Sequence, residues 1–157
     1  VAHLSDFKKF SGNGNFVNDV DCAIAQPIQK KLADLIPDII DIGIARGTIK
    51  ARRGMKVIKA GRTSGKTTSE IIDVNFHIKL DYGIIGEVGF ANQILCKQFT
   101  QEGDSGSLVL DQATGKAVGL HFAGGELGSV SNPIDKVLAS LGVKLGTKSK
   151  SDREAKT

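Results

Sequence analysis

The segment Gly103-Asp104-Ser105-Gly106-Ser107 carries the strongest chemical signal in the sequence. A serine hydroxyl is a weak nucleophile by itself and becomes reactive only beside a base. The segment runs directly into the apolar residues Leu108-Val109-Leu110, which is typical of a strand. Ser105 is therefore a candidate nucleophile at the start of a strand. The alternative is an ordinary Gly/Asp/Ser turn between two strands.

A second motif, from Ala60 to Thr67, has the spacing of a phosphate-binding P-loop. A P-loop needs a helix immediately afterwards, because the helix N-terminus and the loop amides hold the phosphates together. Here the apolar residues alternate from Ile72 to Leu80, which predicts a half-buried strand. The preceding "GMKVIKAG" also predicts a strand. We therefore interpret the motif as the tight turn of a hairpin, and nucleotide binding is not expected.

Short strands separated by glycine-rich turns account for most of the remaining chain. Besides the hairpin, strands are expected within "HLSDFKKFSG", "NDVDCAIAQP", "GTIKAR", "GFANQILCKQF", "GDSGSLVLD" and "AVGLHFAGG". The segment "NPIDKVLASLGV" predicts one helix, with Asn132 as N-cap, Pro133 at the first helical position and Gly142 as the stop. About eight short strands and a C-terminal helix favour an antiparallel barrel or sandwich.

Composition excludes several classes of function. The chain has 157 residues, enough for one domain with a core, and no apolar run long enough to span a bilayer. It begins with Val rather than Met, which suggests a processed chain. A basic stretch is interpreted as a solvated hairpin face, because no recognition helix or stacking aromatics accompany it. Its members are Lys50, Arg52, Arg53, Lys56, Lys59, Arg62 and Lys66. Neither a nucleic acid nor a membrane is expected as a partner.

The cysteines and histidines do not suggest a metal or cofactor site. Two cysteines, Cys22 and Cys96, lie in apolar segments and are expected to be buried free thiols. The histidines His3, His77 and His121 are scattered, without metal-ligand spacing. No metal and no cofactor are therefore expected.

Together these segments resemble the chymotrypsin-like serine proteases. "GDSGS" before a strand, then "AVGLHFAGG" and a terminal helix, resemble the second half of that family. "GRTSGKTT" and "NPI…VL…LGV" resemble its bacterial trypsin-like group. The resemblance implies an all-β fold: a chymotrypsin-like antiparallel β-barrel, the second barrel of the family plus remnant strands of the first, with a C-terminal helix. The expected division is 1–46 for the remnant and linker, 47–145 for the barrel and helix, and 146–157 for a disordered tail.

The resemblance also implies roles for individual residues. Ser105 would be the nucleophile of a His-Asp-Ser triad, and the backbone N–H groups of Gly103 and Ser105 would form the oxyanion hole. Gly106 would leave room beside the nucleophile. Asp21 in "VDCAIAQP" matches the family's aspartate at the start of a buried strand, with Asp19 as the runner-up.

The resemblance places the walls of the substrate pocket on either side of the nucleophile. The residues expected there are Phe99, Thr100, His121, Phe122, Ala123 and Gly124. "GLHFAGG" resembles the histidine-bearing strand of glutamyl endopeptidases and of picornaviral chymotrypsin-like cysteine proteases, which implies cleavage after Glu or Gln. The alternatives are a core histidine, or a shifted register in which Phe122 faces the pocket. No acidic residue stands at the pocket base, where Phe99 falls, so cleavage after Lys or Arg is not expected.

The catalytic histidine has no counterpart in this sequence. Only His3 precedes Asp21, and its surroundings, "VAHLSDFKKF", are typical of a strand. The chain is thus expected to be the C-terminal portion of a serine endopeptidase that acts on a peptide or protein substrate and is inactive alone. Its expected partner is an N-terminal fragment carrying the histidine, or a second copy in a homo-oligomer. The alternatives are a protease-derived binding module and a basic nucleic-acid-binding barrel.

Overall fold

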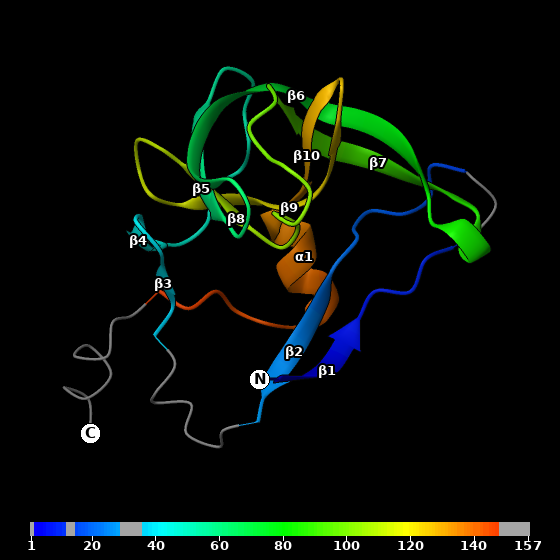
Figure 1. Ribbon diagram of the computed structural model, residues 1–157, viewed down its shortest axis with the longest axis horizontal. Helices are drawn as coiled ribbons and strands as arrows, with labels where there is room; N and C mark the ends of the chain where they lie inside the picture. The colour runs from blue at the N-terminus through cyan, green and yellow to red at the C-terminus, as the bar shows by residue number, and fades with distance from the viewer. Residues whose placement is uncertain (1, 12–14, 29–35, 148–157) are drawn as a thin grey trace.

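Six strands close into an antiparallel barrel in the computed structural model, which describes residues 2–11, 15–28 and 36–147 (Figure 1). Around the barrel the strands follow the order β10-β7-β6-β5-β8-β9. Their bounds are β5 Lys56–Gly61, β6 Gly65–Asp81, β7 Glu87–Cys96, β8 Leu108–Asp111, β9 Ala117–Gly125 and β10 Gly128–Pro133. The predicted closed barrel is confirmed, and closure leaves no free edge among its strands.

The motif from Ala60 to Thr67 forms a hairpin turn, as predicted. Strands β5 and β6 pair in register from Lys56 opposite Glu70 to Gly61 opposite Gly65. No helix follows Thr67, because β6 continues as a strand to Asp81. From Ile71 onward the exposed side chains of β6 alternate with more buried ones, which is the period of a half-buried strand.

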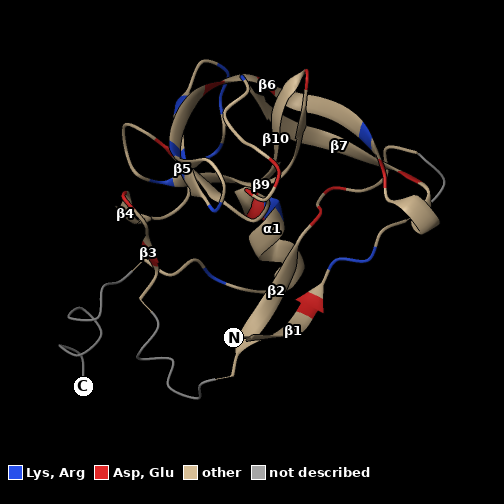
Figure 2. Ribbon diagram, viewed as in Figure 1, with Lys and Arg blue, Asp and Glu red and all other residues tan. Residues whose placement is uncertain are grey.

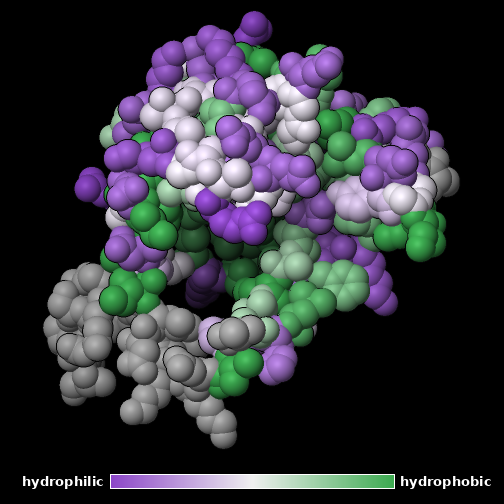
Figure 3. Space-filling model, viewed as in Figure 1, coloured by the Kyte–Doolittle hydropathy of each residue, from purple (hydrophilic) through white to green (hydrophobic). Residues whose placement is uncertain are grey.

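Two smaller sheets lie outside the barrel. Strands β1 (Ala2–Phe7) and β2 (Ala23–Pro27) form an antiparallel pair, and β3 (Asp38–Ile39) pairs with β4 (Gly43–Ile44). Every residue of β1 is exposed, including Leu4 and Phe7. Figure 3 shows apolar side chains over β1 and β2, and again at the end of the β6–β7 hairpin, where Ile84 and Ile85 are exposed.

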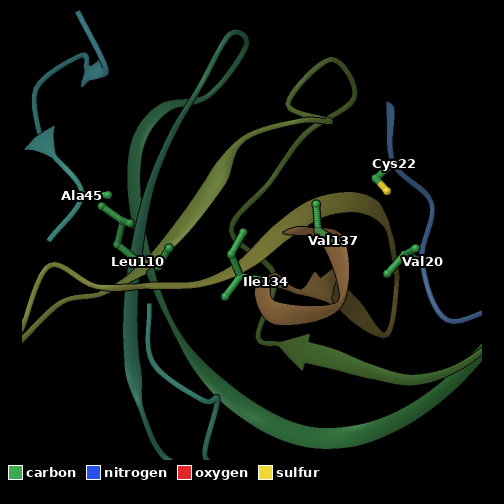
Figure 4. Packing of buried hydrophobic residues seen from close by; sticks show 7 residues of the cluster. Val20, Cys22, Ala45, Leu110, Ile134 and Val137 are labelled. Carbon is green, nitrogen blue, oxygen red and sulfur yellow. The ribbon is translucent and has the colours of Figure 1, made fainter. Parts of the chain in front are cut away.

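The C-terminal helix α1 (Ile134–Leu141) joins the β1–β2 region to the barrel. Ile134 and Val137 of the helix pack with Val20, Cys22 and Leu110 in one buried cluster (Figure 4). A second cluster fills the barrel itself and includes Val57, Ile71, Ile94, Cys96, Phe99, Val109 and Val118. In the described part of the chain, no helix is long and apolar enough to cross a membrane.

The start of helix α1 differs from the prediction by one residue. Pro133 occupies the N-cap, with φ −57° and ψ 130°, and Asn132 stays in β10. Asn132 does not cap the helix because its side chain is engaged with the backbone of Asp21, as described below. The predicted stop is confirmed: Gly142 is the C-cap, in the left-handed conformation that glycine adopts without strain.

Both cysteines are buried free thiols, as expected. Burial raises the pKa of both thiols, that of Cys96 to about 12. The predicted disordered tail lies largely outside the described residues, and the division at residues 46 and 145 stays a prediction.

Replacing Gly142 with Ala is expected to destabilise the protein by about 1 kcal/mol, because a Cβ is strained at its φ of +62°. Urea unfolding followed by circular dichroism measures the change. Gly125→Ala is the matched control, since an added Cβ there meets open space and φ lies outside the left-handed region. Equal stability of the two variants would contradict the assigned cap.

Candidate active site

Ser105 lies exposed on the loop between β7 and β8, and this loop is tied to β9. The N–H of Gly106 donates to the carbonyl of His121 at 2.8 Å, and the N–H of His121 donates to the carbonyl of Ser107 at 2.9 Å. These two bonds lie on either side of the predicted nucleophile. They place Ser105 beside the strand that carries the predicted pocket residues.

Asp104, directly before Ser105, is fully buried and accepts five hydrogen bonds through its carboxylate. The donors are Lys59 Nζ at 2.8 Å, the backbone N–H groups of Thr63, Ser64 and Gln101 at 2.9, 3.1 and 3.0 Å, and Ser64 Oγ at 2.5 Å. Burial by itself raises the pKa of Asp104. The hydrogen bonds from Lys59, Ser64 and the backbone outweigh burial and hold that pKa far below its usual range.

Lys59 corrects the interpretation of the basic stretch as a solvated face. Figure 2 shows basic residues gathered around β5 and the turns beside it, and six of the seven predicted members are exposed. Lys59 has no exposed side-chain surface, because its ammonium pairs with Asp104 inside the barrel. The alternation of β5 contains the signal, since Lys59 lies two residues after Val57, which is also fully buried.

Two glycines allow the β5–β6 turn to approach this loop. A Cβ on Gly61 would lie 2.3 Å from Asp104 Oδ1. Gly103 has φ +94°, and a Cβ there would lie 2.5 Å from Thr63 Oγ1. Gly106 is different: an added Cβ meets open space, but φ is +87°. Glycine at this position therefore serves the backbone conformation. That it also leaves room beside the nucleophile stays a prediction.

The amides predicted for the oxyanion hole are available for a ligand. Among the described residues, no acceptor takes a hydrogen bond from the N–H of Gly103 or from that of Ser105. The neighbouring N–H of Asp104, in contrast, donates to the carbonyl of Gln101 at 3.0 Å. Two N–H groups close to the candidate nucleophile are thus unengaged in the described part of the chain, as binding an oxyanion would require.

A cavity of about 420 Å³ opens beside Ser105. Its walls contain Ser105, Gly103 and five of the six predicted pocket residues, namely Thr100, His121, Phe122, Ala123 and Gly124. The sixth, Phe99, is not part of the lining: it belongs to the barrel core, with its ring centroid 5.9 Å from Lys59 Nζ. The remaining lining residues are Gln98, Gln101, Glu102 and Gly125.

A β-bulge interrupts β9 where the strand lines the cavity. Pairing with β10 passes from Ala123–Val130 to His121–Ser131, so Phe122 is the extra residue. Its ring packs edge-on against Phe90, with centroids 5.3 Å apart, and its carbonyl lies 3.5 Å from Ser105 Oγ. Both His121 and Phe122 thus line the cavity, and which of them meets a substrate side chain stays a prediction.

His121 is buried in the cavity wall with its Nδ1 atom unpartnered among the described residues. Burial lowers the pKa of His121, the Lys59 ammonium lowers it further, and the Val130 backbone and the Asp104 carboxylate oppose them. An ordinary histidine pKa is about 6.5, so the ring is neutral at pH 7. A neutral imidazole can donate one N–H and accept at its other nitrogen.

Thr100 shares the cavity with His121 and is held by its neighbours. Its hydroxyl and that of Ser129 lie 2.6 Å apart, and both side chains are buried. Gln98 Nε2 donates to the Thr100 carbonyl at 2.6 Å. The cavity therefore presents a fixed hydroxyl close to a buried imidazole.

Asp21 is connected to the barrel through both its backbone and its side chain. The Asn132 amide accepts from the N–H of Asp21 at 2.9 Å and donates to its carbonyl at 2.7 Å, and it also donates to the carbonyl of Leu120 at 3.4 Å. The hydroxyl of Tyr82 donates to Asp21 Oδ2 at 2.5 Å. The runner-up, Asp19, pairs instead with Lys136 at 2.6 Å.

No histidine in the described part of the chain forms a hydrogen bond with Ser105 Oγ. His3 lies in exposed β1 opposite Gln26, and the His77 ring packs against Phe16. In the same part of the chain, no group of three His, Cys, Asp or Glu side chains could hold a metal ion.

Comparison with known proteins identifies the architecture. No family model matches the sequence, and no curated protein matches it. Among solved structures, the chain is similar to Cellulomonas bogoriensis chymotrypsin, with a TM-score of 0.66 and 21% identity over 90% of this chain and 75% of that one. It is also similar to Nocardiopsis protease, with a TM-score of 0.64 and 19% identity over 90% of this chain and 73% of that one.

A third similar structure is a glutamic acid-specific serine protease described as using a histidine triad in substrate binding. The TM-score is 0.63, with 20% identity over 85% of this chain and 72% of that one. The fold is that of the bacterial chymotrypsin-like serine proteases. The six-stranded barrel and terminal helix of this chain thus belong to a chymotrypsin-like architecture, as the sequence predicted.

Breaking the Lys59–Asp104 pair is expected to destabilise this chymotrypsin-like barrel by about 3–5 kcal/mol, because a buried charge would lose its partner. Asp104→Ala should cost more than Lys59→Met, since it leaves the buried lysine without a counter-charge and four other donors without their acceptor, whereas Lys59→Met leaves those four bonds in place. Urea unfolding measures both. Lys56→Met, at an exposed lysine of the same strand, is the control and should change stability by no more than about 0.5 kcal/mol.

Acid should weaken the same interaction. The pKa of Asp104 is lower in the folded protein than in the unfolded chain, where it is about 3.9. The contribution of Asp104 to the free energy of unfolding is therefore complete above about pH 3.9 and is lost as pH falls towards the folded-state pKa. Wild-type stability should therefore decline below about pH 4, and Asp104→Asn should show a shallower decline. Parallel pH profiles for the two proteins would contradict the assignment.

Proposed function

We propose that this chain carries the nucleophile and substrate pocket of a serine endopeptidase, with Ser105 as the attacking residue and Asp21 as the carboxylate that orients its base. One observation carries the proposal: Ser105 is exposed at a cavity lined by five of the six predicted pocket residues, and its own N–H and that of Gly103 are unengaged among the described residues. In peptide hydrolysis, those amides would bind the oxyanion that forms as the serine attacks the carbonyl carbon. The likeness to chymotrypsin-like proteases supports this chemistry.

The base comes, in this proposal, from a further polypeptide segment that packs beside Asp21. The three histidines of the chain are accounted for elsewhere, in β1, in β6 and in the cavity wall. Exposed apolar residues of β1, Leu4 and Phe7, offer a surface for such a segment. Without a base, Ser105 stays a neutral hydroxyl, and the chain alone is expected to be inactive.

The cavity suits a substrate side chain that ends in an amide or carboxylate. A Gln or Glu side chain could pair with the unpartnered His121 and with the Thr100 hydroxyl. An apolar side chain would leave His121 Nδ1 unpaired, so the site would disfavour it. The glutamic acid-specific protease of the same fold, with its histidines in substrate binding, supports this assignment.

The charges around the cavity favour the amide at neutral pH. His121 is neutral there, and Glu102 is the one acidic residue among those that line the cavity. A substrate carboxylate would gain more from a protonated imidazole, which forms only as pH falls. We therefore expect preference for Gln near pH 8 and growing acceptance of Glu at lower pH.

Labelling with a fluorophosphonate tests the nucleophile. The isolated chain should react slowly at Ser105, free imidazole should accelerate the reaction severalfold by acting as an external base, and Ser105→Ala should abolish it. Ser107→Ala is the control, because its hydroxyl donates to the Asp104 carbonyl. Mass spectrometry locates the label.

Two outcomes would overturn the assignment of the nucleophile and base. Rapid stoichiometric labelling without imidazole would mean that the chain contains its own base. Absence of label at Ser105 at every imidazole concentration would leave the chain as a protease-derived binding module.

Peptide binding tests the pocket without relying on catalysis. Three acetylated pentapeptides that differ only in a central Gln, Glu or Leu are titrated against Ser105→Ala by calorimetry between pH 8 and pH 5. The Glu peptide should tighten as pH falls, because its carboxyl, with a pKa of about 4.3, stays ionised while His121 gains a proton. The Gln peptide should bind about tenfold more tightly than the Leu peptide, an advantage that His121→Ala should remove. Equal binding of all three would exclude this pocket assignment.

A further inference from the structure

Tyr82 contributes to this site, although its position in the sequence does not suggest it. It lies at the end of the β6–β7 hairpin, immediately before a short 3-10 turn, Gly83–Ile85, and far along the chain from Asp21. Nevertheless its hydroxyl donates to Asp21 Oδ2 at 2.5 Å. A hydroxyl that donates to a carboxylate forms a stronger hydrogen bond than one between two neutral groups.

The ring that carries this hydroxyl is held on several sides. It packs at centroid distances of 4.9 Å from Phe10 and 6.2 Å from Phe90, and Phe90 is fully buried. The Tyr82 N–H donates to the carbonyl of Gly86 at 3.0 Å, which closes the hairpin end. A side chain fixed in this way is suited to holding another group in place.

The contacts of Asp21 are divided between two residues. Asn132 takes both backbone groups of Asp21, and Tyr82 takes one carboxylate oxygen. In the described part of the chain, no donor reaches the other oxygen, Oδ1. One oxygen is therefore held while the second is available to an incoming N–H.

We propose that Tyr82 is a positioning residue that fixes the Asp21 carboxylate in one rotamer and leaves Oδ1 free to accept the N–H of the base. The role of the carboxylate rests on the proposed function, whereas the contact itself does not. Burial and the hydrogen bond to Asp21 raise the pKa of Tyr82, so the phenol stays a donor across the physiological range.

The sole tyrosine of the chain makes the contact measurable, since there is no tryptophan to mask its emission. A carboxylate acceptor quenches tyrosine fluorescence, so Asp21→Asn should brighten the emission at pH 7. Asp19→Asn is the control, because Asp19 pairs with Lys136 and should leave the emission unchanged. Unchanged emission in Asp21→Asn would overturn the contact.

Nuclear magnetic resonance tests the positioning role directly. The Hα–Hβ couplings of Asp21 should show one rotamer in the wild type and averaged values in Tyr82→Phe, which keeps the ring packing and loses only the hydroxyl. Identical couplings in the two proteins would refute the proposal. Failure of Ser105 to label, with the fluorescence and coupling changes intact, would refute the proposed protease function but not the role of Tyr82 towards Asp21.

Discussion

The buried ion pair between Lys59 and Asp104 is the interaction on which the rest of the site depends. Burying a carboxylate is costly unless its oxygens are fully hydrogen-bonded, and here five donors surround it. These donors come from β5, from the β5–β6 turn and from Gln101, so one carboxylate joins three segments. Ser105 follows Asp104 directly, and the position of its hydroxyl is thereby coupled to the barrel core.

The β5–β6 turn also holds an anion. A turn that presents backbone N–H groups beside a lysine can bind an anion. In this protein the anion is the side chain of Asp104, supplied by another loop of the same chain, and the lysine is Lys59. The lysine of the P-loop spacing, Lys66, takes no part: it is exposed and donates to the Asp41 carbonyl, so the match to that motif is coincidental.

Features that depend on residues close together in the sequence could be predicted, whereas contacts between residues far apart in the sequence could not. Alternation along β6, the hairpin turn, the glycines around Ser105 and the β9 segment are local patterns, and the barrel could be predicted from them together with the resemblance. The side-chain partners of Asp21 could not: Tyr82 and Asn132 lie 61 and 111 residues away in sequence. Asn132 was assigned to a helix cap because local chemistry favours it there, and a long-range contact prevailed. Phe99 was predicted in the pocket wall from the resemblance, and in the structure it packs in the barrel core instead.

His121 has a polar atom in the wall of the cavity that is unpaired among the described residues. In the described part of the chain, three buried polar atoms lack a partner, on Gln93, His121 and Ser131, and only His121 lines the cavity beside Ser105. An unpaired buried polar group costs about 1–3 kcal/mol, so a ligand that pairs with it recovers that free energy on binding. The Asp104 and Lys59 charges act on the imidazole in opposite directions. Burial is the largest influence on the pKa of His121, and it keeps the ring neutral although the Asp104 carboxylate raises that pKa. The imidazole beside the nucleophile loop is therefore uncharged, with Nδ1 available to a polar side chain.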